Sequence, residues 1–265
     1  MTTIVLGHSG FIGKYIYNNL KKNNKKVIGG NTKNCNLLNK KKINNFFKKK
    51  NNFNLIICSS LVKSKVDNQK SFNKNILMIS NLLSVINKKK INKIIFLSSI
   101  DVYKSTAKFK ESTSPTVPKT KYGLSKLISE YLLKNEFSHK KLVILRLTGV
   151  YDDDIKGRNM ISHIRRGFRA RSLNINSSGN ELRDYIHVAD VAKIVSFFLK
   201  NNFSGIYNLA TGSSKSVRSY VDKIKKLQTS KKVEIKYSLK NNLQNITIDI
   251  TKLKKIFSLS KIKNF

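Results

Sequence analysis

The chain has 265 residues, 40% of them hydrophobic, and 53 Lys and Arg against 14 Asp and Glu give it a formal net charge of +39. This length allows one sizeable core with a small second lobe. No apolar run approaches the roughly 18 residues of a membrane span. The N-terminus enters a hydrophobic strand without the charged segment of a secretory signal, and the two cysteines have neither metal-ligand spacing nor a disulfide framework. We therefore expect a cytoplasmic protein with no membrane partner and no metal site.

The lysines occur in short runs along the whole chain, mixed with Asn, at places where helices should end or loops begin. Such a charge favours nucleic-acid binding in general, but no groove-reading motif and no aromatic–basic interleaving accompanies it. A compositional drift toward Lys, Asn and Ile explains the runs more simply. We expect no specific nucleic-acid partner.

Arginine is distributed differently, because five arginines fall between residues 158 and 171 and Arg183 follows closely. Arg binds phosphate through paired hydrogen bonds better than Lys does. The group is a candidate anion site, with a solvated helix face as the alternative.

Residues 2–6 predict a short buried strand, and a glycine-rich turn leads from it into a helix with apolar residues at helical spacing. Strand, turn and helix in this order are the context of a dinucleotide-binding fingerprint. Gly7 permits the tight turn, Gly10 allows the backbone to approach a pyrophosphate, and Gly13 allows the helix to pack on the strand. The glycine spacing, with two residues between each pair, differs from the usual Gly-x-Gly-x-x-Gly.

Two further strands are expected at residues 26–28 and 55–57. After the first, Asn31 and Lys33 stand where an acidic residue would hold the ribose 2′-hydroxyl of NAD, which favours NADP weakly. The second ends in Cys58-Ser59-Ser60, small residues suited to close approach by a cofactor. A long helix is expected over residues 68–87.

A fourth strand at residues 94–97 ends in hydroxyl side chains, and a polar loop then leads to a helix that begins near Tyr122. Tyr122 and Lys126 are four residues apart, so they share one helix face. A nearby ammonium favours the phenolate form of a tyrosine. With Ser99 they make a proton-transfer unit at the carboxyl end of a strand, where open α/β sheets bind ligands. Chance occurrence of the Tyr-x-x-x-Lys spacing is the alternative.

A fifth strand is expected at residues 142–145, and helices at 155–168, 216–227 and 251–257 follow. Alternating strands and helices predict an α/β fold: a doubly wound parallel Rossmann sheet with a small C-terminal α/β substrate lobe. We assign residues 1–151 to the dinucleotide-binding domain, with 187–212 returning to it. Residues 152–186 and 213–265 form the expected substrate lobe.

Taken together, these residues resemble the extended short-chain dehydrogenase/reductase superfamily, and within it the NAD-dependent epimerase/dehydratase family that acts on nucleotide sugars. The resemblance covers nearly the whole chain. It rests on the glycine turn, the Ser98-Ser99 strand end, Tyr122 with Lys126, the strand exit at residues 146–151, the 183–188 segment and the 207–212 segment.

The resemblance implies the following site. Tyr122 transfers the proton, Ser99 hydrogen-bonds the same oxygen, and Lys126 lowers the phenol pKa and holds the nicotinamide ribose. Asp101 is a further catalytic candidate, and Ser99, Arg158 and Arg183 are expected to contact the substrate. The residues expected at the NAD or NADP cofactor are Gly7, Ser9, Gly10, Phe11, Ile12, Gly13, Asn31, Asn36, Leu37, Cys58, Ser59, Ser60, Asn75, Tyr122, Lys126 and Val150.

The expected activity is that of a nucleotide-sugar epimerase or 4-ketoreductase with hydride transfer at a sugar carbon. A dehydratase is an alternative, although Ile100 occupies one of the two usual acidic positions of that class. A non-catalytic NAD(P)-binding regulatory protein is the other alternative. Gly149 and Asp152 depart from the family pattern, and the helices around 68–87 and 120–135 suggest a homodimer by analogy.

Overall fold

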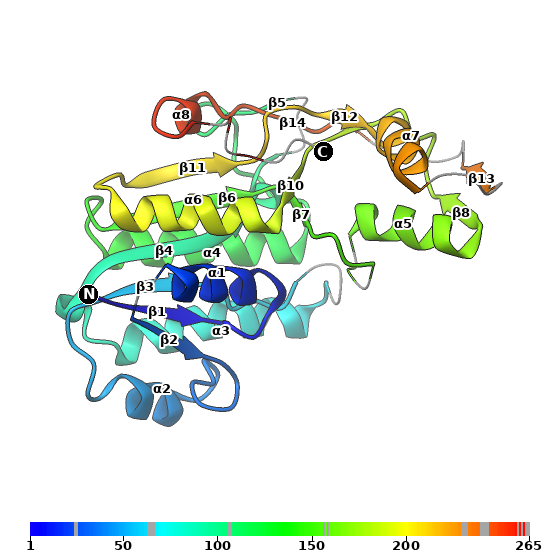
Figure 1. Ribbon diagram of the computed structural model, residues 1–265. Coiled ribbons are helices and arrows are strands. Elements are labelled where there is room, and N and C mark those ends of the chain that lie inside the picture. The colour runs from blue at the N-terminus through cyan, green and yellow to red at the C-terminus, as the bar shows by residue number, and fades with distance from the viewer. Residues whose placement is uncertain are drawn as a thin grey trace. The chain divides into compact units, whose positions relative to one another are not determined.

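The predicted parallel strands form one six-stranded sheet in the computed structural model, in the order β11-β6-β4-β3-β1-β2 (Figure 1). β1 pairs in parallel with β2 and β3, and β4 pairs in parallel with β3 and β6. The predicted doubly wound α/β fold is therefore confirmed. The strands of this sheet are β1 (Thr2–Leu6), β2 (Val27–Gly30), β3 (Phe53–Ile57), β4 (Ile91–Ser99), β6 (Leu142–Leu147) and β11 (Gly205–Leu209).

The structure describes residues 1–23, 26–62, 67–104, 108–155, 157, 159–228, 233–238, 244–258, 260 and 262. They fall into two units, each with its own contacts. Unit 1 comprises residues 1–104, 115–147 and 189–207, and unit 2 comprises residues 105–114, 148–188 and 208–265. No helix among the described residues is long and apolar enough to cross a membrane.

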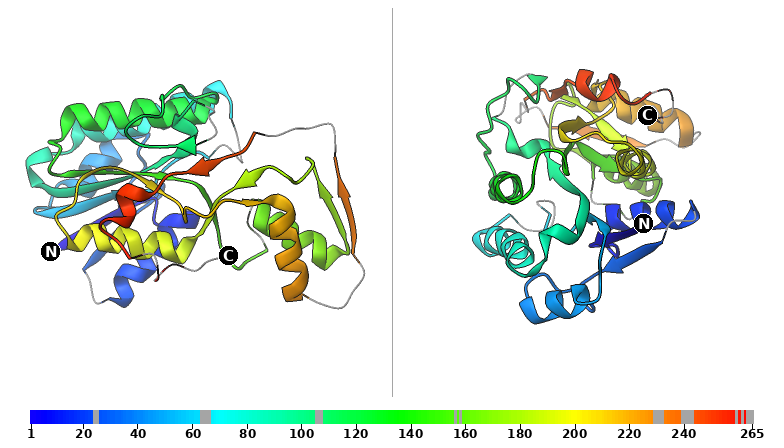
Figure 2. Two further views of the ribbon diagram at one scale, coloured as in Figure 1. Left: turned by 90° about the horizontal axis from the view of Figure 1, so that it is seen from above. Right: turned by 90° about the vertical axis from the view of Figure 1, so that its left-hand side faces the viewer.

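Helices cover both faces of the unit 1 sheet, as the right-hand view of Figure 2 shows. One face packs on α2 (Lys40–Phe47), α3 (Gln69–Val85) and α4 (Lys121–Glu136), and the shared core contains Leu55, Phe96 and Ile144 from the strands. The other face carries α1 (Phe11–Lys22) and α6 (Val188–Lys200), which are joined by a 2.8 Å hydrogen bond from Asn19 to Ser196. Successive residues of a strand point to opposite faces of the sheet. Because helices cover both faces, the side chains on both faces of these strands are apolar.

Side-chain caps set the starts of the helices in unit 1. Asn68 and Ser71 form a capping box at α3, Asn39 caps α2, and the Thr120 hydroxyl accepts a hydrogen bond from the amide of Gly123 at α4. Caps of this kind satisfy amides that the first helical turn leaves free. The Thr120 cap fixes the turn that carries Tyr122.

Unit 2 contains α5 (Met160–Ala170), α7 (Val217–Gln228), α8 (Thr251–Lys254) and four two-stranded pairs. Its core joins α5 and α7 to the parallel pair β8–β13. The strands are β5 (Lys108–Phe109), β7 (Gly149–Tyr151), β8 (Ser172–Ile175), β9 (Leu182–Arg183), β10 (Tyr185–His187), β12 (Lys215–Ser216), β13 (Glu234–Tyr237) and β14 (Thr247–Ile248).

The expected helix start at residue 155 is wrong. α5 begins at Met160 because the Asn159 side chain accepts a hydrogen bond from the amide of Ser162 and so caps the helix there. Arg166 donates two hydrogen bonds to loop carbonyls, those of Ile155 and Gly157. These bonds keep the preceding segment in a loop.

Candidate active site

The glycine turn after β1 has the geometry expected of a phosphate-binding turn. Gly7 has φ +82°, and its amide donates to the carbonyl oxygen of Gly30 over 2.7 Å. A Cβ at Gly13 would lie 2.1 Å from the carbonyl oxygen of Gly7, so α1 packs directly on the turn. A Cβ at Gly10 would meet only that same oxygen, at 3.3 Å. The Gly10 side of the turn therefore has room for a ligand beside the N-terminus of α1.

The loop after β2 is held by its own polar side chains. Asn31 accepts hydrogen bonds from the amides of Lys33 and Asn34, at 2.9 and 3.3 Å, and Asn36 accepts from the amide of Leu38 at 3.0 Å. The Lys33 side chain is exposed, and Leu37 is buried in the core beneath the loop. The Asn31 and Asn36 side chains therefore fix the shape of this part of the predicted cofactor site.

Asn75 joins the end of β3 to the helix that carries Tyr122. Its side-chain oxygen accepts from the amide of Leu61 at 2.8 Å, and its side-chain nitrogen donates to the carbonyl of Leu61 at 3.0 Å and to the Ser125 hydroxyl at 3.3 Å. Cys58 stands at the start of this loop, and burial raises the pKa of its thiol to about 12. The loop of small residues is therefore fixed against α4.

Tyr122 lies in the first turn of α4, close to the end of β4. A Cβ at Gly123 would lie 2.1 Å from the carbonyl oxygen of Asp101, so this glycine allows α4 to approach the 3₁₀ turn η2 (Ile100–Val102). The Asp67 carboxylate accepts from the backbone amide of Tyr122 at 2.8 Å. The Ser99 hydroxyl accepts from the amide of Asp101 at 3.1 Å.

Lys126 is buried one turn after Tyr122. Its ammonium donates to the carbonyl of Leu97 at 2.8 Å, and it lies 4.8 Å from the ring centroid of Phe96 and 5.7 Å from that of Tyr122. The structure thus brings the end of β4 and the Tyr122–Lys126 face of α4 together.

Burial dominates the titration of this pair. It raises the pKa of the Tyr122 phenol, the Asp101 charge raises it further, and a hydrogen bond with Ser60 lowers it. Burial lowers the pKa of Lys126 to about 8, and charge interactions with Cys58 and Glu130 oppose that change. The pKa of the Tyr122 phenol is thus raised overall by burial and by Asp101, and the expectation that Lys126 lowers it stays a prediction.

Sequence reasoning missed a buried ion pair below this site. Arg146 donates to both carboxylate oxygens of Glu130, at 3.0 and 2.7 Å, and the Ser98 hydroxyl donates to the same carboxylate at 2.5 Å. Glu130 has no exposed surface. The signal in the sequence is an acid four residues after Lys126 in a chain with few acids.

Of the two substrate residues predicted in unit 2, the structure describes Arg183. The Arg183 guanidinium donates to the carbonyls of Leu182 and Gln244, both at 2.7 Å. The neighbouring acids have other partners: Asp184 accepts from Thr211 and Gly212, and Glu181 accepts from Ser177. Val150 lies in β7, paired with Ile186. Arg158 lies outside the described residues.

Other members of the arginine group hold the loop before α5. Arg165 donates to the carbonyl of Asp152 at 2.7 Å and to the Asp153 carboxylate at 3.2 Å. Arg166 binds loop carbonyls as described above. These two side chains have structural partners, while the anion-site prediction for the group stays a prediction.

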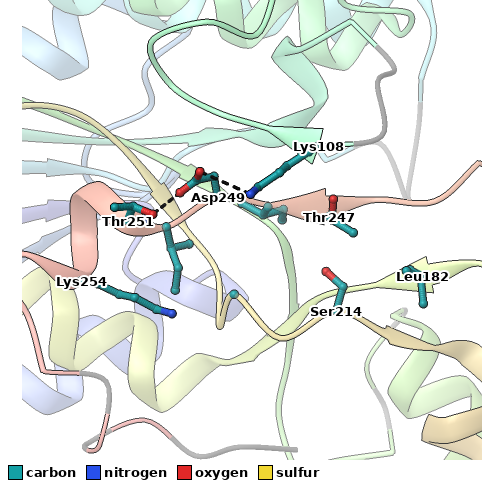
Figure 3. A pocket seen from close by; sticks show the side chains of 10 residues that line it. Lys108, Leu182, Ser214, Thr247, Asp249, Thr251 and Lys254 are labelled. Carbon is teal, nitrogen blue, oxygen red and sulfur yellow. Dashed lines mark hydrogen bonds and ion pairs between the residues drawn. The ribbon is translucent and has the colours of Figure 1, made fainter.

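Unit 2 also has a pocket of about 280 Å³ between β14, α8 and the segment after Gly212 (Figure 3). Its charged side chains are Lys108, Lys254 and Asp249, and the first lies 3.7 Å from the last. None of the residues predicted for cofactor or substrate lines it within the described chain. Nor do the described residues contain a group of three or more His, Cys, Asp or Glu arranged for a metal ion.

The sequence of this chain is similar to those of known proteins. Residues 3–210 match the NAD dependent epimerase/dehydratase family. An ADP-L-glycero-D-manno-heptose-6-epimerase of Brachyspira hyodysenteriae is 29% identical over 267 residues, which cover 87% of this chain and 82% of that protein. A Methanocaldococcus jannaschii protein described as "Putative UDP-glucose 4-epimerase" is 33% identical over 159 residues, covering 57% of this chain and 52% of that protein.

Among solved structures, an ADP-L-glycero-D-manno-heptose-6-epimerase of Helicobacter pylori has a TM-score of 0.83 at 20% identity, with 100% of this chain and 91% of that chain covered. The Thermus thermophilus UDP-glucose 4-epimerase, solved in complex with NAD, has a TM-score of 0.80 at 21% identity, with 96% and 92% covered. At these identities the structures establish the shared fold. The family match covers most of the sequence, so the chain belongs to the NAD dependent epimerase/dehydratase family.

Proposed function

We propose that this chain is an NAD-dependent nucleotide-sugar epimerase in which Ser99, Tyr122 and Lys126 handle the proton. The observation that carries the proposal is the placement of Tyr122 and Lys126 on one face of α4, next to the Ser99 strand end. The carboxyl ends of parallel strands are where open α/β sheets bind ligands. The glycine turn and the loop after β3 lie at the same edge of the sheet.

In this mechanism Tyr122 reacts as its phenolate: it accepts the hydroxyl proton of the sugar as the carbon that bears this hydroxyl is oxidised, and the resulting phenol returns the proton when the carbonyl is reduced from the opposite face. Ser99 donates a hydrogen bond to the same oxygen. The Lys126 ammonium stabilises the Tyr122 phenolate before it accepts the proton and again after the proton is returned. A bound nicotinamide dinucleotide supplies the chemistry of hydride acceptance and return.

The residues present fit such a dinucleotide. The open side of Gly10 permits close backbone approach, and the amides of Phe11 and Ile12 stand at the start of α1. We favour NAD over NADP. The expectation of NADP depends on Asn31 and Lys33 alone, and the similar proteins give it no support. The Asn31 side-chain oxygen accepts bonds within its own loop, and similar structures are described with NAD. Fluorescence titration should give a lower dissociation constant for NADH than for NADPH.

For the substrate, we propose a nucleotide sugar whose diphosphate contacts Arg183 of unit 2. Relatives solved with UDP-glucose give the class, and a guanidinium binds phosphate oxygens through charge-assisted hydrogen bonds. Displacing the two backbone carbonyls that Arg183 now binds is part of this proposal. Arg183→Ala should raise KM about tenfold or more, since each 1.4 kcal/mol is tenfold, and leave cofactor affinity unchanged. A loss of thermal stability alone, with KM unchanged, would make Arg183 structural.

The decisive experiment is a panel of nucleotide sugars incubated with the protein and NAD⁺, NADH, NADP⁺ or NADPH, with products separated by chromatography and identified by NMR. An epimerase gives an isomer of unchanged mass without net cofactor turnover. A dehydratase gives a product that has lost water, and a ketoreductase consumes reduced cofactor stoichiometrically. Cofactor binding with no product from any sugar would favour the regulatory alternative.

We also propose a homodimer through α3 and α4. Both helices expose large apolar side chains, namely Leu77 (47% exposed), Leu124 (39%) and Tyr131 (63%). Large apolar side chains that form one continuous exposed patch mark an interface, and the proposal places these three in such a patch. Sedimentation should give a dimer that Leu77→Lys weakens, whereas a monomer at all concentrations would refute it.

A further inference from the structure

Glu130 of α4 and Arg146 of β6 form a buried ion pair on the helix that carries Tyr122 and Lys126. Glu130 follows Lys126 by four residues, so the two side chains lie one above the other on the same face of α4. Glu130 is fully buried, and Lys126 and Arg146 are 5% and 3% exposed. Two cations and one carboxylate therefore share a nearly dry region.

The carboxylate is held on both of its oxygens. Arg146 reaches Oε1 through Nε at 3.0 Å and Oε2 through Nη2 at 2.7 Å, and Ser98 reaches Oε1 at 2.5 Å. The guanidinium lies 4.7 Å over the ring of Tyr103. The Glu130 carboxylate therefore cannot turn away from this position without losing these bonds.

Stability alone is a weak reason for such a group. A buried ion pair can often be replaced by apolar residues without loss of stability, because desolvation of the two charges offsets their attraction. Glu130 lies one helical turn from Lys126. Arg146 lies on β6, the strand next to β4, which carries Ser99. This placement points to a role at the site.

We propose that Glu130 is a positioning residue whose fixed carboxylate keeps Lys126 protonated, with Arg146 and Ser98 holding that carboxylate in place. The inference rests on the proposed function, since it assigns Lys126 its charged form at the site.

The groups that face Lys126 support this assignment. Tyr122 and Glu130 face it from α4, the carbonyl of Leu97 and the ring of Phe96 from β4, and the Cys58 thiol from the end of β3. Burial raises the pKa of both Cys58 and Tyr122, which favours their neutral forms in the cofactor-free protein. Glu130 is thus the carboxylate that can offset burial of the ammonium, while Arg146 would add repulsion if Glu130 were neutral.

The test compares Glu130→Gln with Glu130→Asp. Both variants disturb packing, but only Gln removes the charge. The ionisation of Lys126 is measured in the cofactor-free protein by competitive acylation across pH 5–10, with mass spectrometry of the Lys126 peptide. The wild-type midpoint is expected near pH 8, where the pKa of Lys126 lies. Gln should move the midpoint down by at least one pH unit, and Asp should leave it within a few tenths.

The direction of the activity change follows from the charge. The ammonium is present below the pKa of Lys126 and is lost as pH rises through it. Glu130→Gln should therefore move the alkaline limb of kcat to lower pH, with at least about a fivefold loss at pH 8 and a smaller loss at pH 6. KM should change less than kcat.

An unchanged acylation midpoint in Glu130→Gln, whatever its thermal stability, would overturn the proposal and leave a purely structural ion pair. If the single variant does not fold because Arg146 is left as a buried unpaired charge, the double variant Glu130→Gln/Arg146→Gln takes its place. Its midpoint should still fall, by less, and an unchanged midpoint would again overturn the proposal. A shifted midpoint in a protein inactive on every nucleotide sugar would refute the proposed function alone.

Discussion

The two edges of the unit 1 sheet contrast sharply in composition. At the carboxyl edge, the four residues after β1, after β3 and after β4 contain no lysine, and Ser and Gly are the commonest among them. At the amino edge, Lys49, Lys50, Lys88–Lys90, Lys140 and Lys141 stand just before β3, β4 and β6. In a chain with a net charge of +39, the absence of lysine is the more informative feature.

Physical chemistry explains both edges. Lysine is readily solvated and complements the C-terminal end of a helix, so helix ends that lead into strands accept it. The opposite edge packs backbone against backbone, as the missing Cβ atoms at Gly13 and Gly123 indicate. A long charged side chain has no space at these two contacts.

The largest effect is expected at the carboxyl edge from Tyr122→Phe. Removal of the phenol hydroxyl removes the proton-transfer group, so turnover should fall by a factor of about 10² to 10⁴. Cofactor binding, followed by fluorescence, should persist. Tyr131→Phe on the same helix is the matched control, because Tyr131 is 63% exposed. Turnover of Tyr122→Phe within a few-fold of the parent would reject Tyr122 as the proton-transfer residue.

The glycine turn should separate binding from folding. Gly10 has φ −76° and ψ 169°, which any residue adopts, and a Cβ there meets one atom at 3.3 Å. Gly10→Val should therefore weaken cofactor binding at least tenfold, or about 1.4 kcal/mol, and preserve the melting temperature.

Gly13→Ala should act first on the stability of the fold rather than on cofactor binding. Its Cβ would overlap the carbonyl oxygen of Gly7 at 2.1 Å, so the melting temperature should fall by several degrees, as expected for about 1–3 kcal/mol of overpacking. Calorimetry and cofactor titration together check the pair. Equal cofactor affinity of Gly10→Val and the parent would show that the open side of the turn does not bind the dinucleotide.

Local signals explain what could be predicted from the sequence. The strand, turn and helix around Gly7 are contiguous in the chain, and Tyr122 and Lys126 are related by one helical turn, so spacing alone predicts their proximity. The parallel order of the sheet follows because strands and helices alternate. None of this requires knowing which residues meet across the core.

Most of the parts that were missed depend on tertiary contacts, and one depends on a local helix cap. The Glu130–Arg146 pair joins a helix to a strand, and neither residue has a periodicity that marks it. β9 and β12 have two residues each, too few for a hydrophobic pattern. The start of α5 depends on the Asn159 cap in a chain where Asn is common. The raised pKa of Tyr122 follows from burial, which spacing does not reveal.

The smallest effect is expected from the lysines at the two ends of α2. Lys48 is the C-cap of this helix and Lys49 follows it, whereas Lys40 and Lys41 open its first turn. The partial charges of a helix favour cations at its C-terminal end and disfavour them at its N-terminal end, each by about 0.3–1 kcal/mol at low ionic strength.

The double variant Lys48→Gln/Lys49→Gln should therefore lower the free energy of unfolding, and Lys40→Gln/Lys41→Gln should raise it by a similar amount. All four side chains are exposed, so salt should reduce both changes. Turnover should stay within twofold of the parent in both variants, because compositional drift explains these lysines and gives them no role beyond being solvated. Urea unfolding at 0.02 and 0.5 M salt measures the two changes. Equal signs in the two variants would refute the helix-end explanation, and a loss of turnover confined to Lys48 and Lys49 would give the amino edge a function.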